Sequence, residues 1–179
     1  MNRREALSSV ALLLGGTIIG SSAFLSGCKA NPDAAAGVLS AADMSLLNDI
    51  AEIIIPTTNT PGAKAAEVGE FMGVIVTDCY DAKDQKVFKD GLAALASKFS
   101  AANAEAQQKM IVDLDAEAKK YQETKTAEQP THYFTMIKQL TLWGYFSSEI
   151  GATQALRYVA IPGKYEGCVP YKKGDKAWA

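Results

Sequence analysis

The chain has 179 residues, of which 48% are hydrophobic and 21% are charged, and its formal net charge is −2. This length and composition are typical of one globular domain that is large enough to bury a core. Acidic and basic residues are mixed along the chain, and the clustered basic face that nucleic-acid binding requires is absent from the sequence, which excludes that function.

The first 27 residues have the features of a signal peptide. Arg3 and Arg4 give a basic start, residues 10–24 form an uncharged apolar stretch, and small residues follow before Cys28. Parts in this order are typical of a secretory leader that is removed from the mature protein. The adjacent arginines indicate the twin-arginine route, which carries folded cargo. Ordinary secretion is the alternative.

The segment Leu25-Ser26-Gly27-Cys28 resembles the lipoprotein box of bacteria. We therefore predict cleavage before Cys28, attachment of lipid to Cys28, and a lipidated tether over residues 28–39. Acyl chains hold a protein at a membrane surface without a spanning segment. The expected location is the periplasmic side of a membrane, as an anchored lipoprotein.

Four amphipathic helices are predicted between residues 40 and 124. Ser40 is the expected N-cap of the first helix, with Asp43 in the capping-box position, and Pro56 ends that helix. Asn103 is the expected N-cap of the fourth helix. Apolar residues at helical spacing mark the remaining stripes, over residues 68–79, 88–99 and 110–121.

The fifth predicted helix, Tyr133 to Ser148, has almost no polar face. A helix that is apolar all round is expected to be buried on all sides. Either the other four helices surround it or a partner covers part of it. The predicted fold is therefore all-α, with a small helical domain of about five helices over residues 40–150.

Residues 151–179 form a predicted irregular arm that is rich in glycine, proline and aromatic residues. Its aromatic residues include Tyr158, Tyr165, Tyr171 and Trp178. Because tyrosine and tryptophan are enriched at protein interfaces, we expect the arm to contact a partner. An arm that folds back on its own helices is the alternative.

Two cysteines remain in the mature chain, Cys79 and Cys168. An exported protein meets an oxidising compartment, in which disulfides persist. The pair could bond to each other, one could bond to a partner chain, or both could stay free. Cys79 continues the apolar stripe of the second helix, which predicts a buried, structural thiol.

No motif for catalysis, cofactor binding or metal binding is found in the sequence. His132 is the only histidine and the cysteines lack zinc spacing. Dinucleotide and phosphate loops are also missing. We expect His132 to be a surface residue of the first helical turn. We expect Glu149 to be a helix-end charge facing water, and an ion pair with Arg157 is the alternative. The aspartates at 78, 81 and 84 are expected to form a solvated loop.

Three segments of the chain resemble the subunit 3 family of gluconate 2-dehydrogenase, which comprises the small subunits of membrane-associated FAD-dependent sugar dehydrogenases. These segments are the arginine-bearing leader, the run Ile53-Ile54-Ile55-Pro56-Thr57-Thr58-Asn59-Thr60-Pro61-Gly62-Ala63, and residues 143–151 with Tyr158, Pro162-Gly163, Tyr165, Gly167-Cys168 and Pro170 after them.

The resemblance implies a non-catalytic accessory subunit that binds a large flavoprotein of the glucose-methanol-choline type and assists its export and maturation. FAD is then expected in that partner and no cofactor in this chain, and a cytochrome subunit often accepts the electrons. The lipoprotein box is not required by that role and indicates that this chain also anchors the complex. Trp143 and the arm aromatics are the expected partner contacts. Two other hypotheses remain, a free-standing periplasmic lipoprotein that binds a ligand or acts as a scaffold, and a small helical enzyme.

Overall fold

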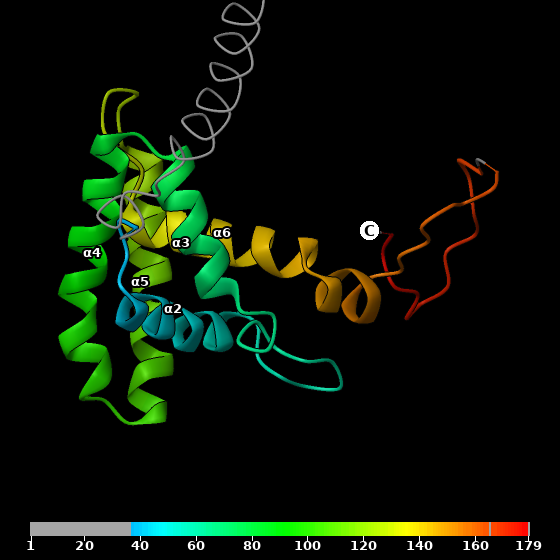
Figure 1. Cartoon of the computed structure of the whole chain (residues 1–179), viewed down its shortest axis with the longest axis horizontal. Coiled ribbons are helices and arrows are strands. Elements are labelled where there is room, and N and C mark those ends of the chain that lie inside the picture. The colour runs from blue at the N-terminus through cyan, green and yellow to red at the C-terminus, as the bar shows by residue number, and fades with distance from the viewer. Residues whose placement is uncertain (1–36, 165, 179) are drawn as a thin grey trace, which may run out of the picture. The chain divides into compact units, whose positions relative to one another are not determined.

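The computed structural model describes residues 37–164 and 166–178. The predicted signal peptide, Arg3, Arg4, Cys28 and most of the tether lie outside the described residues, as does Tyr165. The described chain is helical, which confirms the predicted all-α fold (Figure 1). Its elements are α2 (Ala41–Ile54), α3 (Val68–Cys79), α4 (Ala82–Ser100), α5 (Ala104–Thr124), α6 (Tyr133–Ser147) and the short π-helix η1 (Gly151–Ala155).

Both predicted N-caps are present. The side chain of Ser40 accepts a hydrogen bond from the Asp43 backbone N–H at 3.2 Å, and the Asp43 carboxylate accepts one from the Ser40 N–H at 2.9 Å. At the start of α5, the side-chain oxygen of Asn103 accepts from the Ala106 N–H at 2.9 Å. Each cap satisfies N–H groups without partners inside the helix and is worth about 1 kcal/mol.

The three aspartates that were expected to form a solvated loop are instead divided between two helices. Asp78 lies in α3, and Asp81 is the N-cap of α4, where its carboxylate accepts from the Asp84 N–H at 2.8 Å. The carboxylate of Asp84 lies in the first turn, where the helix dipole favours negative charge. The connection between α3 and α4 is therefore only a two-residue turn.

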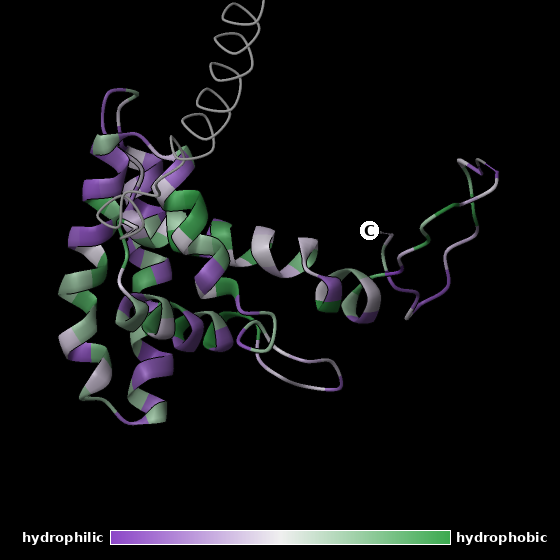
Figure 2. Cartoon of the chain, viewed as in Figure 1, coloured by the Kyte–Doolittle hydropathy of each residue, from purple (hydrophilic) through white to green (hydrophobic). Residues whose placement is uncertain are grey.

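Helix α6 is the central element of the core, because it contacts α2, α3, α4 and α5. In Figure 2 it carries little of the hydrophilic colour, whereas α4 and α5 carry hydrophilic and hydrophobic residues along their length. The side chains that α6 contributes to the core are Phe134, Met136, Ile137, Leu140 and Tyr145. The buried faces of the other helices, such as Phe88 and Phe99 of α4, pack in the same cluster.

Of the two alternatives predicted for α6, enclosure by the other four helices is wrong for its C-terminal half. Leu142, Trp143 and Phe146 are 41%, 55% and 40% exposed, respectively. These residues are spaced so that they share one arc of the helix. The other described helices therefore cover most of α6 and leave this arc open.

The arm returns to its own beginning. The Arg157 N–H donates to the Ala177 carbonyl at 2.7 Å, and the Arg157 guanidinium lies 4.2 Å from the ring centroid of Trp178. The ammonium group of Lys176 also donates to the Gln154 carbonyl in η1. These contacts close residues 157–178 into a loop.

The compact unit Gly37–Ala179 contains every residue of the described core. This unit has its own hydrophobic centre and is therefore expected to fold without the preceding residues. Among the described residues, none of the helices has the length and apolar character that crossing a membrane requires.

Candidate docking surfaces

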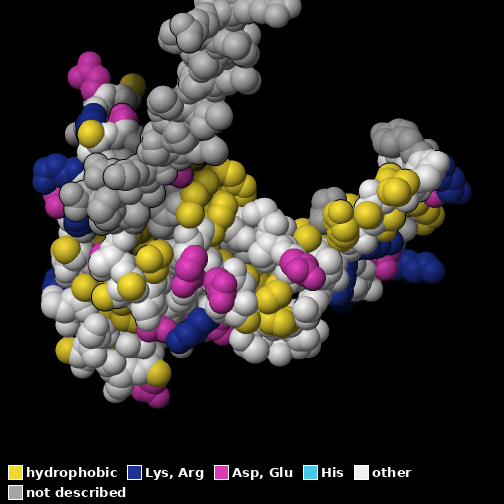
Figure 3. All heavy atoms as spheres, in the orientation of Figure 1, with side chains coloured by type: hydrophobic (Ala, Val, Ile, Leu, Met, Phe, Trp, Pro, Cys, Tyr) yellow, Lys and Arg dark blue, Asp and Glu magenta, His cyan; other side chains and the backbone are white. Residues whose placement is uncertain are grey.

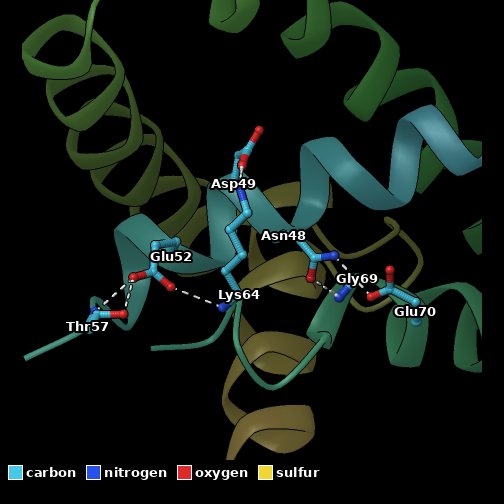
Figure 4. Close-up of polar contacts among 7 residues, drawn as sticks. All are labelled: Asn48, Asp49, Glu52, Thr57, Lys64, Gly69 and Glu70. Atoms are coloured by element: carbon cyan, nitrogen blue, oxygen red, sulfur yellow. Dashed lines mark hydrogen bonds and ion pairs between the residues drawn. The ribbon is translucent and has the colours of Figure 1, made fainter. Parts of the chain in front are cut away.

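The loop between α2 and α3 is held by one carboxylate (Figure 4). Glu52 on α2 accepts from the backbone N–H and the hydroxyl of Thr57, at 2.8 and 2.7 Å, and from the Lys64 N–H at 3.0 Å. Partial burial raises the pKa of Glu52, but the hydrogen bonds from Thr57 and Lys64 outweigh it, so that this pKa lies below its ordinary value. The charged form is thus the one that fixes the loop.

A second polar contact joins α2 directly to α3. Asn48, which is almost fully buried, accepts from the Gly69 N–H at 2.7 Å and donates to the Glu70 carboxylate at 3.0 Å (Figure 4). A Cβ at position 69 would lie 2.2 Å from the Met44 carbonyl oxygen. Glycine is therefore required at this position for the close approach of the two helices.

Two contacts fix α6 against the same region. The Tyr145 hydroxyl donates to the Pro61 carbonyl at 2.7 Å, which ties the core helix to the loop. A Cβ at Gly144 would lie 2.7 Å from a ring carbon of Phe71, so the absence of a side chain there lets α3 and α6 pack closely. This packing leaves the neighbouring residues of α6 on the surface.

We define the α3/α6 face as Phe71 and Val74 of α3 with Leu142, Trp143 and Phe146 of α6. Phe71 meets Trp143 edge to face at a centroid distance of 5.2 Å, which joins the two helices at the surface. Hydrophobic side chains gather over α3 in Figure 3. Exposed apolar surface with aromatic residues at its centre is typical of protein–protein contact sites.

The arm presents a second exposed apolar surface. Ile161 and Tyr171 are 86% and 77% exposed, and hydrophobic side chains follow the arm in Figure 3. A shallow hollow of about 830 Å³ opens on the arm, and its apolar lining includes Val159, Ile161, Val169 and Trp178. Of the aromatic residues predicted to contact a partner, Trp143, Tyr158, Tyr171 and Trp178 are all exposed.

In the part of the chain that the structure describes, Cys79 and Cys168 are both free and exposed, and they are not bonded to each other. The prediction that Cys79 is a buried residue of the apolar stripe is wrong. Cys79 is the last residue of α3 and is exposed, although Val76, three positions earlier on the same stripe, is fully buried. Helical periodicity predicts the direction of a side chain but not whether another element covers it at the end of the helix.

The prediction that His132 is a surface residue of the first helical turn is wrong. His132 is the half-buried N-cap of α6. Its ring nitrogen Nδ1 accepts from the Phe134 N–H at 3.2 Å, and its ring lies between those of Tyr121 and Tyr133, at centroid distances of 5.5 and 4.7 Å. Burial lowers the pKa of His132, and the negative charge of Glu117 offsets part of that change. The neutral imidazole is the form that can accept this bond.

The described residues contain no group of three His, Cys, Asp or Glu side chains that could hold a metal ion. The geometric features brought together by the fold are instead the anchored loop, the α3/α6 face and the closed arm. Sequence patterns did not reveal the contact of Arg157 with Trp178, because its members lie far apart in the chain.

These features define the class as a small all-helical protein with exposed apolar faces of the kind found at protein–protein contacts. The chain belongs to the gluconate 2-dehydrogenase subunit 3 family, because residues 41–163 match the sequence model of that family. No curated protein and no solved structure matches the chain. This match confirms the resemblance drawn from the sequence. The family is named for a subunit of a dehydrogenase complex.

Proposed function

We propose that this chain is a non-catalytic accessory subunit of a membrane-associated, FAD-dependent dehydrogenase for a sugar or sugar acid. The flavoprotein large subunit holds the FAD, and a cytochrome subunit can accept its electrons. The observation that carries the proposal is the α3/α6 face, where Trp143 is exposed on the central helix of a family member. A large aromatic side chain on a rigid helix is a common anchor in protein interfaces.

The loop contacts support a docking role for this face. Glu52, Asn48 and Tyr145 fix the loop, α3 and α6 to one another by hydrogen bonds of 2.7 to 3.0 Å. A surface that is held rigid before binding loses little conformational entropy on binding. Trp143 and the exposed aromatic residues of the arm, together with Tyr165, are the proposed partner contacts.

The leader supports a role in export and anchoring. We infer that Arg3 and Arg4 direct the folded complex to the twin-arginine route and that lipid on Cys28 holds it at the membrane. A flavoprotein that acquires its cofactor before export needs a route for folded cargo, and a bound subunit with such a signal supplies one. Cys79 and Cys168 are exposed, so either thiol is open to a disulfide with the partner.

The first test is purification of the tagged full chain from membranes of its own host. We expect a much larger chain to co-purify, with the absorbance spectrum of bound flavin. The variant Trp143→Ser is expected to lose most of the flavin, whereas Val112→Ser, at an exposed apolar residue of α5, is expected to retain it. A colourless single chain would contradict the proposal and favour the free-standing lipoprotein.

A further inference from the structure

The α3/α6 face has an acidic border. Helix α3 contains no lysine or arginine, and its Asp78 is exposed, whereas the carboxylate of its other acidic residue, Glu70, accepts from Asn48 of α2. The single basic residue of α6 is Lys138, which is bound to Asp115 of α5 at 2.5 Å. That ion pair helps to hold the pKa of Asp115 below its ordinary value and leaves little positive charge for the face.

The arm has the opposite charge. Residues 156–178 contain five basic residues and two acidic ones. Lys164 pairs with Glu166 at 2.5 Å, and the Asp175 carboxylate is engaged by the Lys172 backbone N–H at 2.9 Å. Lys173 and the Lys172 ammonium have no acidic side chain within ion-pair distance in the described part of the chain. The exposed apolar residues of the arm thus lie among uncompensated lysines.

We propose that the flavoprotein partner carries two apolar patches of opposite charge, a basic one that binds the acidic α3/α6 face of this chain and an acidic one that binds its basic arm. This inference rests on the proposed function and specifies the chemistry of both contacts. Complementary charges around apolar centres accelerate association and fix the register of two proteins. Because the two surfaces carry opposite charges, a partner that binds in the reversed orientation meets like charge at both contacts and is repelled.

A second copy of this chain offers the same chemistry, since its basic arm complements the acidic face. That contact would be head to tail, so each added copy would leave one face and one arm open. A single partner that covers both surfaces leaves neither open. An anionic membrane would complement the arm but would repel the face, and thus satisfies only half of the observations.

The experiment uses the complex of the tagged full chain with the co-purifying flavoprotein, immobilised and washed with rising NaCl. Asp78→Lys reverses a charge beside the face, and the double variant Lys172→Glu with Lys173→Glu reverses the arm. We expect each to release the flavoprotein at lower salt and to weaken binding roughly five- to tenfold, the size expected for reversal of charges at an interface border.

Matched controls carry the same charge reversals on other helices. Asp113→Lys alters an exposed residue of α5, and the double variant Lys89→Glu with Lys98→Glu alters exposed residues of α4. We expect binding within about twofold of the wild type for both. All of these positions are exposed, so helical content, measured by circular dichroism, should be kept in every variant and the free energy of unfolding should change by less than about 1 kcal/mol.

Docking variants that behave like their controls would overturn the inference, as would an effect confined to one of the two surfaces. So would self-association of the isolated chain that the same variants abolish, measured by light scattering, or binding to anionic vesicles that is lost only with the arm variant. These outcomes leave the accessory role standing if a flavoprotein still co-purifies. The absence of any flavoprotein would contradict the proposed function itself.

Discussion

At the scale of single residues, the hydroxyl of Tyr145 joins the core helix to the loop that follows α2. The ring is buried, and the hydroxyl donates to a carbonyl 84 positions earlier in the chain. Loss of this donor leaves the Pro61 carbonyl without its partner. An intramolecular hydrogen bond contributes about 1 kcal/mol to stability on average. Removing only one partner costs more than this, because the other partner then stays buried without a hydrogen bond.

We predict that Tyr145→Phe lowers the free energy of unfolding by about 1 to 2 kcal/mol. Urea denaturation followed by circular dichroism measures the change. Tyr171→Phe is the matched control, because Tyr171 is mostly exposed and its loss should change stability by less than about 0.5 kcal/mol. Equal stability of the two variants would show that the loop is not held by this contact.

At the scale of the helix, α6 begins at an N-cap that titrates. His132 accepts from the Phe134 N–H only while its imidazole is neutral, and burial lowers its pKa from 6.5. The unfolded chain, with the ordinary pKa, therefore binds this proton first as the pH falls. The stabilisation from this group is complete above pH 6.5 and is lost as the pH falls towards the lower pKa of the folded state.

We predict that the wild type loses more stability than His132→Asn between about pH 7.5 and about pH 5.5. Asparagine retains an acceptor at the N-cap but does not titrate. His132 is the only histidine in the chain, and most carboxylates titrate below this range. Chemical denaturation at several pH values gives the comparison. Parallel stability curves for the two proteins would exclude a titrating cap.

The elements themselves were largely predictable from local rules. Ser40 and Asn103 mark helix starts through their side chains, and Pro56 follows the end of α2. Apart from Cys79, the predicted stripes lie on the buried or partly buried faces of α2 to α5. The cap at Asp81 was missed, because a cluster of aspartates was interpreted as a loop. The signal that could have identified it is the three-residue spacing of Asp81 and Asp84, which matches that of Ser40 and Asp43.

The sites were less predictable, because they depend on contacts between distant residues. Periodicity identifies α6 as apolar all round but does not say which arc the other helices leave open, so the exposure of Trp143 required the packing. The hydrogen bond from Tyr145 to Pro61 joins residues that are 84 positions apart in the sequence. The contact of Arg157 with Trp178 joins the two ends of the arm. No local rule relates such pairs.

At the scale of the whole molecule, the chain combines one compact helical unit with exposed surfaces of opposite charge. The core of Gly37–Ala179 is complete in itself, so the exposed apolar residues are not needed for its burial. Such residues are costly to keep on a surface, since they promote aggregation unless a partner covers them. The lasting partner that we propose would cover these residues and so explain why they stay on the surface.

This division of roles leads to a prediction about the leader. We predict that replacing Arg3 and Arg4 with lysines leaves the flavoprotein in the cytoplasm, even though its own sequence is unchanged. The twin-arginine route recognises the arginine pair, whereas ordinary secretion requires only positive charge at the start of the leader. Cell fractionation with a flavin-linked dye-reduction assay locates the partner.

The matched control is Lys29→Arg, which preserves the charge beside Cys28 and leaves the arginine pair intact. We expect this variant to deliver the flavoprotein to the membrane like the wild type. Normal delivery by the double lysine variant would exclude twin-arginine export through this chain. Loss of the small chain from the membrane with normal export of the flavoprotein would show that the two travel separately, and the accessory role would then be limited to anchoring.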